Sequence, residues 1–264
     1  MKIAGLQKVS TIDYPGEICC VIFLQGCNFR CGFCYNPELV VGKSDGGFSE
    51  NYVLDFLKSR VGKLDGVCIS GGEPLMSLDL NFVRRIKEMG FKIKIDTNGS
   101  FPFRLREVVD LGLVDYIAMD VKGRREDYSR IINVDVDVSK IEESMKIIYE
   151  FGRLVREKIL AHGLTRTNTD ENLEKVKESG RENNYEFRTT VVGRLHSKES
   201  IIEMARWVNE VCGGKPRRFF LQGFKNKGKM VSLDFKDEKD VGEEFLLGIK
   251  EAVKDYFEEV GVRV

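Results

Sequence analysis

The chain has 264 residues, of which 42% are hydrophobic, enough for one barrel-sized domain or for two small ones. Its 42 Lys and Arg residues balance its 42 Asp and Glu residues, so the net charge gives no argument for nucleic acid or an acidic membrane as a partner. The N-terminus turns polar at once, and the nearest apolar run, Ile18 to Leu24, is far too short to span a bilayer. We therefore expect a cytoplasmic protein without a signal peptide or a membrane segment.

Apolar, β-rich runs alternate with amphipathic segments along the chain. The runs that predict strands are Glu17–Gln25, Gly66–Ser70, Lys92–Asp96, Tyr116–Asp120, Tyr185–Val192 and Arg217–Gln222. The patterns that predict helices are Glu50–Ser59, Leu80–Met89, Arg104–Leu111, Ser139–Phe151, Lys198–Val211 and, at the end of the chain, Glu238–Glu259. Residue types that commonly start helices stand at three of these boundaries, namely Asp79, Ser139 and Ser197.

Six strands separated by crossovers predict an α/β fold with a parallel sheet. The strands are almost continuously apolar, as expected for a sheet that is covered on both faces. Six such units can curl into a partial barrel, and a doubly wound open sheet is the competing architecture. Before the fifth strand, residues 152–183 form an unusually long link with a helical pattern of its own at Asp170–Ser179.

We expect one domain in three parts. Residues 1–16 would form an N-terminal cap, a short hairpin that ends at the Pro15-Gly16 turn. Residues 17–225 would form the sheet or partial barrel with the insertion at about 152–183, and residues 226–264 a helical extension.

Three of the seven cysteines lie within eight residues, Cys27, Cys31 and Cys34, in the spacing C-x3-C-x2-C. The odd total and this crowding favour reduced thiols or a metal site over disulfides. Three thiolates are one too few for a closed zinc site, but they can hold a four-iron cluster and leave one iron open. Zinc with Cys68 or His196 as a fourth ligand is the alternative; the absence of a second Cys-x2-Cys pair from the sequence makes it the weaker one.

Further motifs follow the predicted strands. They are Gly71-Gly72-Glu73-Pro74, Asp96-Thr97-Asn98-Gly99, Asp120-Val121-Lys122-Gly123 and the loop that contains His196. Each has a structural alternative. Gly71-Gly72 could be a tight turn, and Asn98-Gly99 a common turn pair. Asp120 and Lys122 could form a solvated salt bridge, and His196 could be a structural histidine. Because all of them lie at carboxyl ends of parallel strands, where α/β sheets and barrels place their sites, we expect one ligand site there.

The cysteine loop and the Gly-Gly-Glu-Pro turn resemble the radical S-adenosylmethionine (SAM) superfamily. Within it, the stretches from Gly5 to Gly16, Gln25 to Leu39 and Tyr185 to Val192 are similar to glycyl-radical-enzyme activases, most of all to those that act on anaerobic ribonucleoside-triphosphate reductase. The resemblance covers most of residues 3–150 and 184–225. It departs at Gly193-Arg194, where the family usually has Pro-Gly, and at the inserted residues 152–183, for which a surface elaboration is favoured over a docking element or lid.

The resemblance implies a partial (β/α)6 TIM-like barrel with parallel strands, a [4Fe–4S] cluster on the three loop cysteines, and SAM on the open iron. Gly71, Gly72 and Glu73 would receive the amino group of SAM, and Asp120 and Lys122 would contact its methionine part. The remaining implied contacts, to the ribose or adenine, are those of Asp96, Asn98, His196, Phe33 and Tyr35.

The implied reaction is reductive cleavage of SAM to methionine and a 5′-deoxyadenosyl radical, which takes a hydrogen atom from a glycine of a partner enzyme. Flavodoxin or ferredoxin would supply the electron. Two alternatives stay open: a radical SAM enzyme acting on a small molecule or a modified nucleobase, and a non-catalytic zinc- or cluster-binding module. No membrane contact and no clear nucleic-acid binding is expected.

Overall fold

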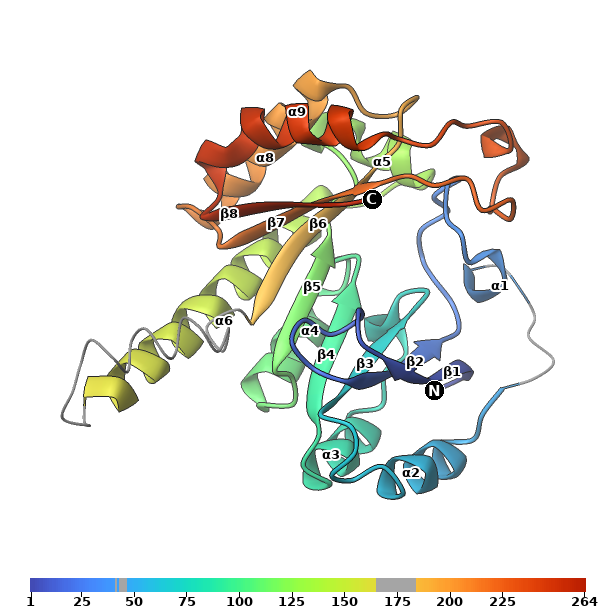
Figure 1. The fold of residues 1–264 in the computed structure, drawn as a ribbon, viewed down its shortest axis with the longest axis vertical. Coiled ribbons are helices and arrows are strands. Elements are labelled where there is room, and N and C mark those ends of the chain that lie inside the picture. Colours follow the sequence, from blue (N-terminus) through green and yellow to red (C-terminus); the bar gives the residue numbers. More distant parts are fainter. Residues whose placement is uncertain (41, 43–46, 165–183) are drawn as a thin grey trace.

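The computed structural model describes residues 1–40, 42, 47–164 and 184–264. They form one eight-stranded sheet whose strands lie side by side in sequence order (Figure 1). β1 is antiparallel to β2, and every later neighbour is parallel. The strands are β1 Ile3–Ser10, β2 Cys19–Leu24, β3 Gly66–Gly71, β4 Lys92–Thr97, β5 Tyr116–Asp120, β6 Tyr185–Val191, β7 Arg218–Gly223 and β8 Glu259–Arg263.

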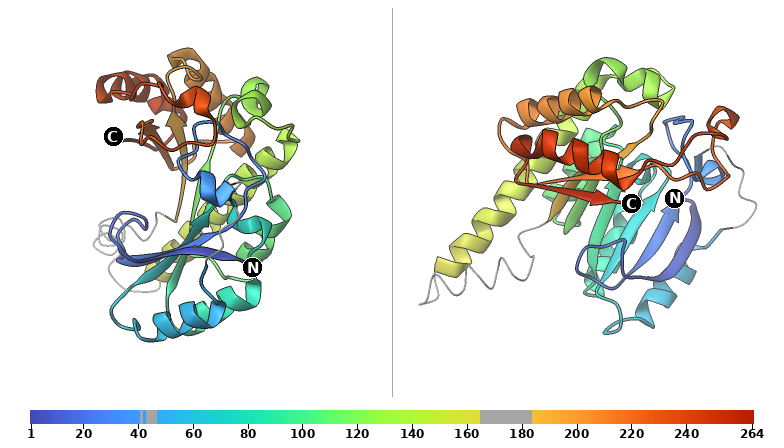
Figure 2. Two further views of the ribbon diagram at one scale, coloured as in Figure 1. Left: turned by 90° about the vertical axis from the view of Figure 1, so that its right-hand side faces the viewer. Right: turned by 45° about the horizontal axis from the view of Figure 1, so that its top comes forward.

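Helices cover the outer side of the curled sheet, and β1 and β8 form its two unjoined ends (Figure 2). In the described ranges the α-helices are α1 Pro37–Val40, α2 Glu50–Lys58, α3 Leu80–Glu88, α4 Pro102–Asp110, α5 Tyr128–Ile132, α6 Val138–Leu164, α8 Lys198–Cys212 and α9 Glu243–Val253. Short 3-10 helices are η1 Pro74–Met76, η2 Arg125–Asp127, η3 Leu233–Phe235 and η4 Lys254–Tyr256.

The central strands are buried along almost their whole length. Five of the six residues of β2 are buried, and so are the first four of β3. Apolar side chains on both faces of a strand need cover on both faces, which parallel crossovers provide. Because β2 to β7 are parallel, their carboxyl ends all lie at one edge of the sheet, and the loops that leave this edge build the site.

The six predicted strands are confirmed as β2 to β7. Their unbroken sequence order is that of a partial barrel and not of a doubly wound sheet, in which the order reverses. Asp79 and Ser197 are confirmed as helix starts, since both side chains accept main-chain N–H groups of the first turn. Ser139 is wrong by two positions: it lies inside α6, and Asp137 accepts its N–H at 3.1 Å.

Two predictions at the ends of the chain are wrong. The helix expected over Glu238–Glu259 is shorter, because the chain turns at η4 and then adds β8 beside β7. The expected hairpin within residues 1–16 does not form by itself. Instead β1 pairs with β2, so that the cap is part of the sheet. The helical pattern at Asp170–Ser179 lies outside the described residues.

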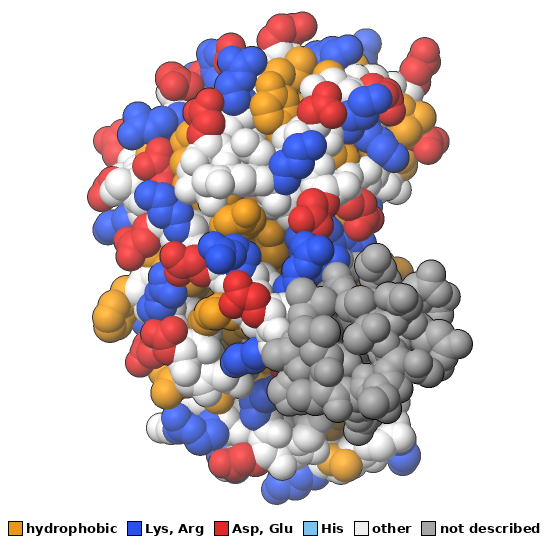
Figure 3. All heavy atoms as spheres, turned by 90° about the vertical axis from the view of Figure 1, so that its left-hand side faces the viewer, with side chains coloured by type: hydrophobic (Ala, Val, Ile, Leu, Met, Phe, Trp, Pro, Cys, Tyr) orange, Lys and Arg blue, Asp and Glu red, His pale blue; other side chains and the backbone are white. Residues whose placement is uncertain are grey.

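Acidic and basic side chains are interspersed on the face shown in Figure 3, in keeping with the balanced composition. Of the helices in the described ranges, none is long and apolar enough to cross a membrane.

Candidate active site

The Gly71-Gly72 turn is pressed against the start of the cysteine loop. A Cβ atom on Gly72 would lie 1.9 Å from the Gly26 carbonyl oxygen, and one on Gly71, whose φ is 129°, would lie 2.2 Å from that of Leu24. The Glu73 N–H donates to the Gly26 carbonyl at 2.8 Å. Only glycine permits so close an approach of two backbones, so these glycines join the loop after β3 to the cysteine loop.

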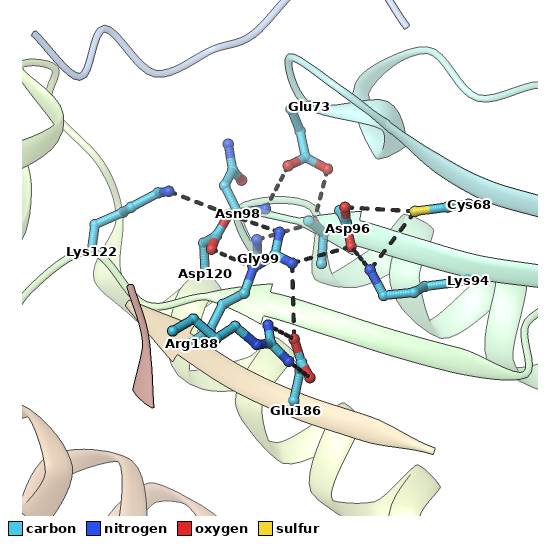
Figure 4. Close-up of polar contacts among 12 residues, drawn as sticks. Cys68, Glu73, Lys94, Asp96, Asn98, Gly99, Asp120, Lys122, Glu186 and Arg188 are labelled. Atoms are coloured by element: carbon cyan, nitrogen blue, oxygen red, sulfur yellow. Dashed lines mark hydrogen bonds and ion pairs between the residues drawn. The ribbon is translucent and has the colours of Figure 1, made fainter. Parts of the chain in front are cut away.

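The Glu73 carboxylate is fully buried and holds this turn to the end of β4 (Figure 4). It accepts hydrogen bonds from the Leu75 N–H at 3.1 Å, the Thr97 hydroxyl at 2.8 Å and the Asn98 N–H at 2.6 Å. Burial raises the pKa of Glu73 to about 7, although these three donors oppose the shift. The Glu73 side chain, which is expected to receive the amino group of SAM, thus makes three hydrogen bonds inside the protein.

The cysteine loop lies against the loop that follows β4. Asn28 donates to the Ser100 hydroxyl at 2.9 Å and accepts from the Asn98 amide at 3.1 Å. The same Asn98 amide lies 3.9 Å from the Cys27 sulfur, which also accepts the Phe29 N–H at 3.4 Å. The side chain of Asn98 therefore touches the cysteine loop itself.

The three loop thiols fit a metal cluster by their type and by their place on one short loop. Burial raises the pKa of Cys27 to about 12 and that of Cys31 to about 11, so they are neutral thiols until a metal displaces their protons. N–H groups directed at a ligand sulfur, such as that of Phe29, are typical of iron–sulfur sites. The seven cysteines are all free thiols. Within the described ranges, no three Cys, His, Asp or Glu side chains are already grouped around one point as metal ligands.

Beside this loop, Arg188 of β6 joins the acidic residues that end β4 and β5 (Figure 4). Its guanidinium donates to Asp120 at 2.7 Å and lies 3.5 Å from Asp96. Lys122 pairs with the other Asp120 oxygen at 3.3 Å, and Lys94 pairs with Asp96. Burial alone would raise the pKa of Asp120, but the Arg188 and Lys122 charges hold it well below its ordinary value. The two carboxylates are thus ionised.

The network continues inward to a third, deeper carboxylate, that of Glu186, whose side chain is 1% exposed. Arg263 of β8 binds both of its oxygens at 2.8 Å, and the Tyr116 hydroxyl donates to it at 2.8 Å. Burial of Glu186 is therefore compensated by charge and hydrogen bonds. The sequence analysis missed Lys94, Glu186 and Arg263 as parts of this network. Only the Lys94-x-Asp96 and Glu186-x-Arg188 alternation gave a signal, because such residues share a strand face.

His196, for which a ligand contact is expected, is bound to the main chain through both ring nitrogens. Its side chain is buried, one ring nitrogen accepts the Val192 N–H at 3.0 Å, and the other lies 2.9 Å from the Lys122 carbonyl oxygen, to which it donates. Both nitrogens are thus satisfied by the main chain. His196 fixes the backbone at Lys122 and positions that residue.

The two aromatic residues of the cysteine loop pack against a later segment. Phe33 is buried in an edge-on contact with Phe235, with ring centres 6.1 Å apart. Tyr35 stacks on Phe224 at 5.6 Å, and its hydroxyl accepts the Lys225 N–H at 2.7 Å. The interior contacts of Phe33 do not place it at a ligand surface, whereas Tyr35 is only partly buried.

Comparison with known proteins gives the family. The Radical SAM superfamily model matches residues 21–208, most of the barrel and the whole cysteine loop. The chain belongs to the radical SAM superfamily. Its members use a [4Fe–4S] cluster and SAM, so these are the cofactors of this enzyme.

Several relatives carry names of specific enzymes. A protein of Methanocaldococcus jannaschii named as a glycyl-radical enzyme activating enzyme is 32% identical over 214 residues, 79% of this chain and 75% of that protein. The pyruvate formate-lyase-activating enzyme of Listeria monocytogenes is 28% identical over 67% of this chain and 75% of its own length. The 7-carboxy-7-deazaguanine synthase of Methanospirillum hungatei is 34% identical over 129 residues, 48% of this chain and 51% of that protein.

A solved structure shows the same fold. Methylornithine synthase has a TM-score of 0.55 to this chain at 14% identity, covering 92% of this chain and 63% of that one. The predicted α/β radical SAM fold is therefore confirmed, as is the prediction of a radical SAM enzyme with homologues among glycyl-radical-enzyme activases.

Proposed function

We propose that this radical SAM enzyme installs a glycyl radical on a partner enzyme. The observation that carries the proposal is the meeting of the cysteine loop with the Gly71-Gly72-Glu73 turn and the Asn98 loop, in a chain whose relatives are named as activating enzymes. The three elements together surround one edge of the sheet, where a cluster and a small charged molecule can lie side by side.

In this proposal Cys27, Cys31 and Cys34 hold the cluster. When bound, the cluster and SAM supply one-electron cleavage of SAM and the 5′-deoxyadenosyl radical. The protein orients the cofactors and excludes competing reactions. Asn98 and the Phe29 N–H, which already contact the Cys27 sulfur, fix that ligand and donate toward its negative charge.

The main chain of Gly71 and Gly72 and the charged pair Asp120–Lys122 are assigned to SAM. Gly71 and Gly72 present backbone without side chains, and Glu73 fixes them from inside. Lys122 pairs with Asp120 at 3.3 Å, and its charge opposes the rise in the pKa of Cys31 that burial causes. Asp96 is assigned to the ribose side, with Tyr35 against the adenine.

The partner enzyme is proposed to be anaerobic ribonucleoside-triphosphate reductase, with flavodoxin or ferredoxin as electron donor. The support is the similarity of residues 5–16 and 185–192 to activases of that reductase. The reduced protein, SAM and an anaerobic reductase from the same organism should give a glycyl-radical doublet in electron paramagnetic resonance (EPR) spectra. SAM cleavage without a radical on any glycyl-radical enzyme of that organism would contradict the proposal.

A second candidate function is radical chemistry on a small molecule or a modified nucleobase. It is favoured by the similarity of half of the chain to a 7-carboxy-7-deazaguanine synthase. The two candidates differ in the source of the hydrogen atom that 5′-deoxyadenosine receives. Deuterium from a small substrate in 5′-deoxyadenosine would support the second candidate, and deuterium from a glycine-labelled reductase would support the first.

A further inference from the structure

Residues 225–240, which we name the strap, connect β7 to α9 and lie across the cysteine loop. The ends of the strap are joined, because the Val241 N–H donates to the Phe224 carbonyl at 3.0 Å. Asn226 closes it from within: its amide donates to the carbonyls of Lys236 at 2.7 Å and Glu238 at 3.0 Å. The strap is thus a compact loop with a fixed base, which can act as one unit.

The strap binds the main chain of the cysteine loop directly. The Val231 N–H donates to the Cys34 carbonyl at 3.2 Å, and the Ser232 N–H donates to the Gly32 carbonyl at 3.0 Å. These two carbonyls flank Phe33 and belong to the segment that carries the second and third cysteines. The conformation of that segment therefore depends on a part of the chain roughly 200 residues away in sequence.

Gly32 is packed against the ring of Phe235. A Cβ atom at Gly32 would lie 2.5 Å from that ring, too close for any side chain unless the strap moved. The Phe235 ring also contacts Phe33. The close approach of the strap therefore explains why the residue after Cys31 is a glycine.

Arg194 fastens the strap at this point. Its guanidinium lies over the Phe235 ring at 5.0 Å and donates to the Asp234 carbonyl at 2.6 Å. Its Nε lies 3.4 Å from the Glu238 carboxylate, which also accepts the Arg194 N–H at 3.1 Å. One residue thereby makes four contacts to the strap. It stands in the loop after β6.

We propose that Arg194 is a positioning residue that holds the strap on the cysteine loop and so limits access of solvent to the cluster. The inference rests on the proposed assignment of the cluster to Cys27, Cys31 and Cys34. It adds that the retention of the cluster depends on an arginine whose contacts are with the strap. Loss of Arg194 should let the strap open locally while the barrel stays folded.

The test uses the anaerobically reconstituted full chain and the release of its iron to a ferrous chelator. Arg194→Ala should release iron roughly 5- to 30-fold faster than the wild type, the factor expected for the loss of one such set of contacts. Arg218→Ala is the matched control: Arg218 also lies over a ring, that of Phe220 at 4.8 Å, and pairs with Glu259 at 3.0 Å, but on β7 and β8. It should release iron at the wild-type rate. Equal rates for the two variants would overturn the inference.

Further variants separate positioning from general destabilisation. Arg194→Lys keeps a cation near Glu238. It should release iron more slowly than Arg194→Ala and should regain part of the wild-type EPR line shape with SAM. If Arg194→Ala takes up no cluster, Arg194→Lys can still be compared with the wild type. Gly32→Ala and Phe235→Ala should each speed release, and the double variant should be no faster than Phe235→Ala, since both act through one contact. Additive effects would contradict the proposed contact. A wild-type chain that takes up no iron would contradict the proposed function, whereas a loaded wild type matched by Arg194→Ala contradicts the strap alone.

Discussion

Glu73 and Asp120 are two carboxylates at the same edge of the sheet, stabilised by different means. Glu73 is surrounded by N–H and O–H dipoles, and burial raises its pKa to about 7. Asp120 lies between Arg188 and Lys122, and their charges lower its pKa despite burial. Dipoles fix the position of a buried carboxylate without securing its charge, whereas cations secure both. The first carboxylate is suited to hold a turn, and the second to present a permanent charge to a ligand.

The largest loss of stability is expected from removing Arg188, the cation that the buried carboxylates share. Arg188→Met leaves Asp96, Asp120 and Glu186 without their common partner, and should lower the free energy of unfolding by about 3–5 kcal/mol. Chemical unfolding of the iron-free chain measures this loss. Arg218→Met, which removes an arginine paired at the edge of the barrel, is the control and should cost much less. Equal losses of unfolding free energy in the two variants would show that Arg188 contributes no more to stability than Arg218 does.

A smaller loss of stability is expected at Glu73, whose carboxylate is held by N–H and O–H donors. Glu73→Gln keeps the shape of the side chain but turns an NH2 group toward N–H or O–H donors, and should cost about 1–3 kcal/mol. The same measurement applies, with Glu38→Gln as control. Glu38 is exposed, and its pair with Lys229 at 3.4 Å should contribute almost nothing. An unchanged free energy of unfolding in Glu73→Gln would mean that the hydrogen bonds from Thr97 and Asn98 to Glu73 do not contribute to stability.

The two carboxylates also predict opposite dependences on pH. The pKa of Glu73 rises from 4.5 to about 7 on folding, so the folded chain holds this proton more tightly, and stability falls as the pH increases through that window. The lowered pKa of Asp120 gives stability that is lost only at acid pH. Between pH 5 and 7 the wild type should therefore lose stability relative to Glu73→Gln. Parallel curves for the two proteins would refute the raised pKa.

The smallest effect tests geometry within the charged region. Arg263→Lys keeps the charge beside Glu186 but loses the two-pronged hydrogen bond, and should cost about 0.5–1.5 kcal/mol. Arg263→Met should cost clearly more, because the charge is lost as well. Identical costs would mean that the positive charge of Arg263 contributes nothing, and that the loss comes from the hydrogen bonds and from the contact of the guanidinium carbon with the Phe220 ring, 3.8 Å from the ring centre.

The sequence predicted the part of the molecule that depends on local patterns. β2 to β7 are recognisable as apolar runs, and the motifs after them meet because parallel strands bring their carboxyl ends to one edge. β8 was missed because it is only five residues long, directly follows the predicted helix, and shows the alternation of a strand at Val260 and Val262 alone. The partner of Arg263 lies 77 residues away, and both partners of His196 are backbone groups. Contacts of this kind depend on tertiary packing and leave no local signal.

The most direct test of the account compares cysteines inside and outside the loop. The reconstituted wild type should bind about four irons per chain and cleave SAM to 5′-deoxyadenosine and methionine. Cys31→Ala should lose both properties, whereas Cys212→Ala, which removes a buried thiol of α8 far along the chain, should keep both. A cluster and SAM cleavage that survive Cys31→Ala, or that are lost equally in Cys212→Ala, would contradict the assignment of the cluster to the cysteine loop.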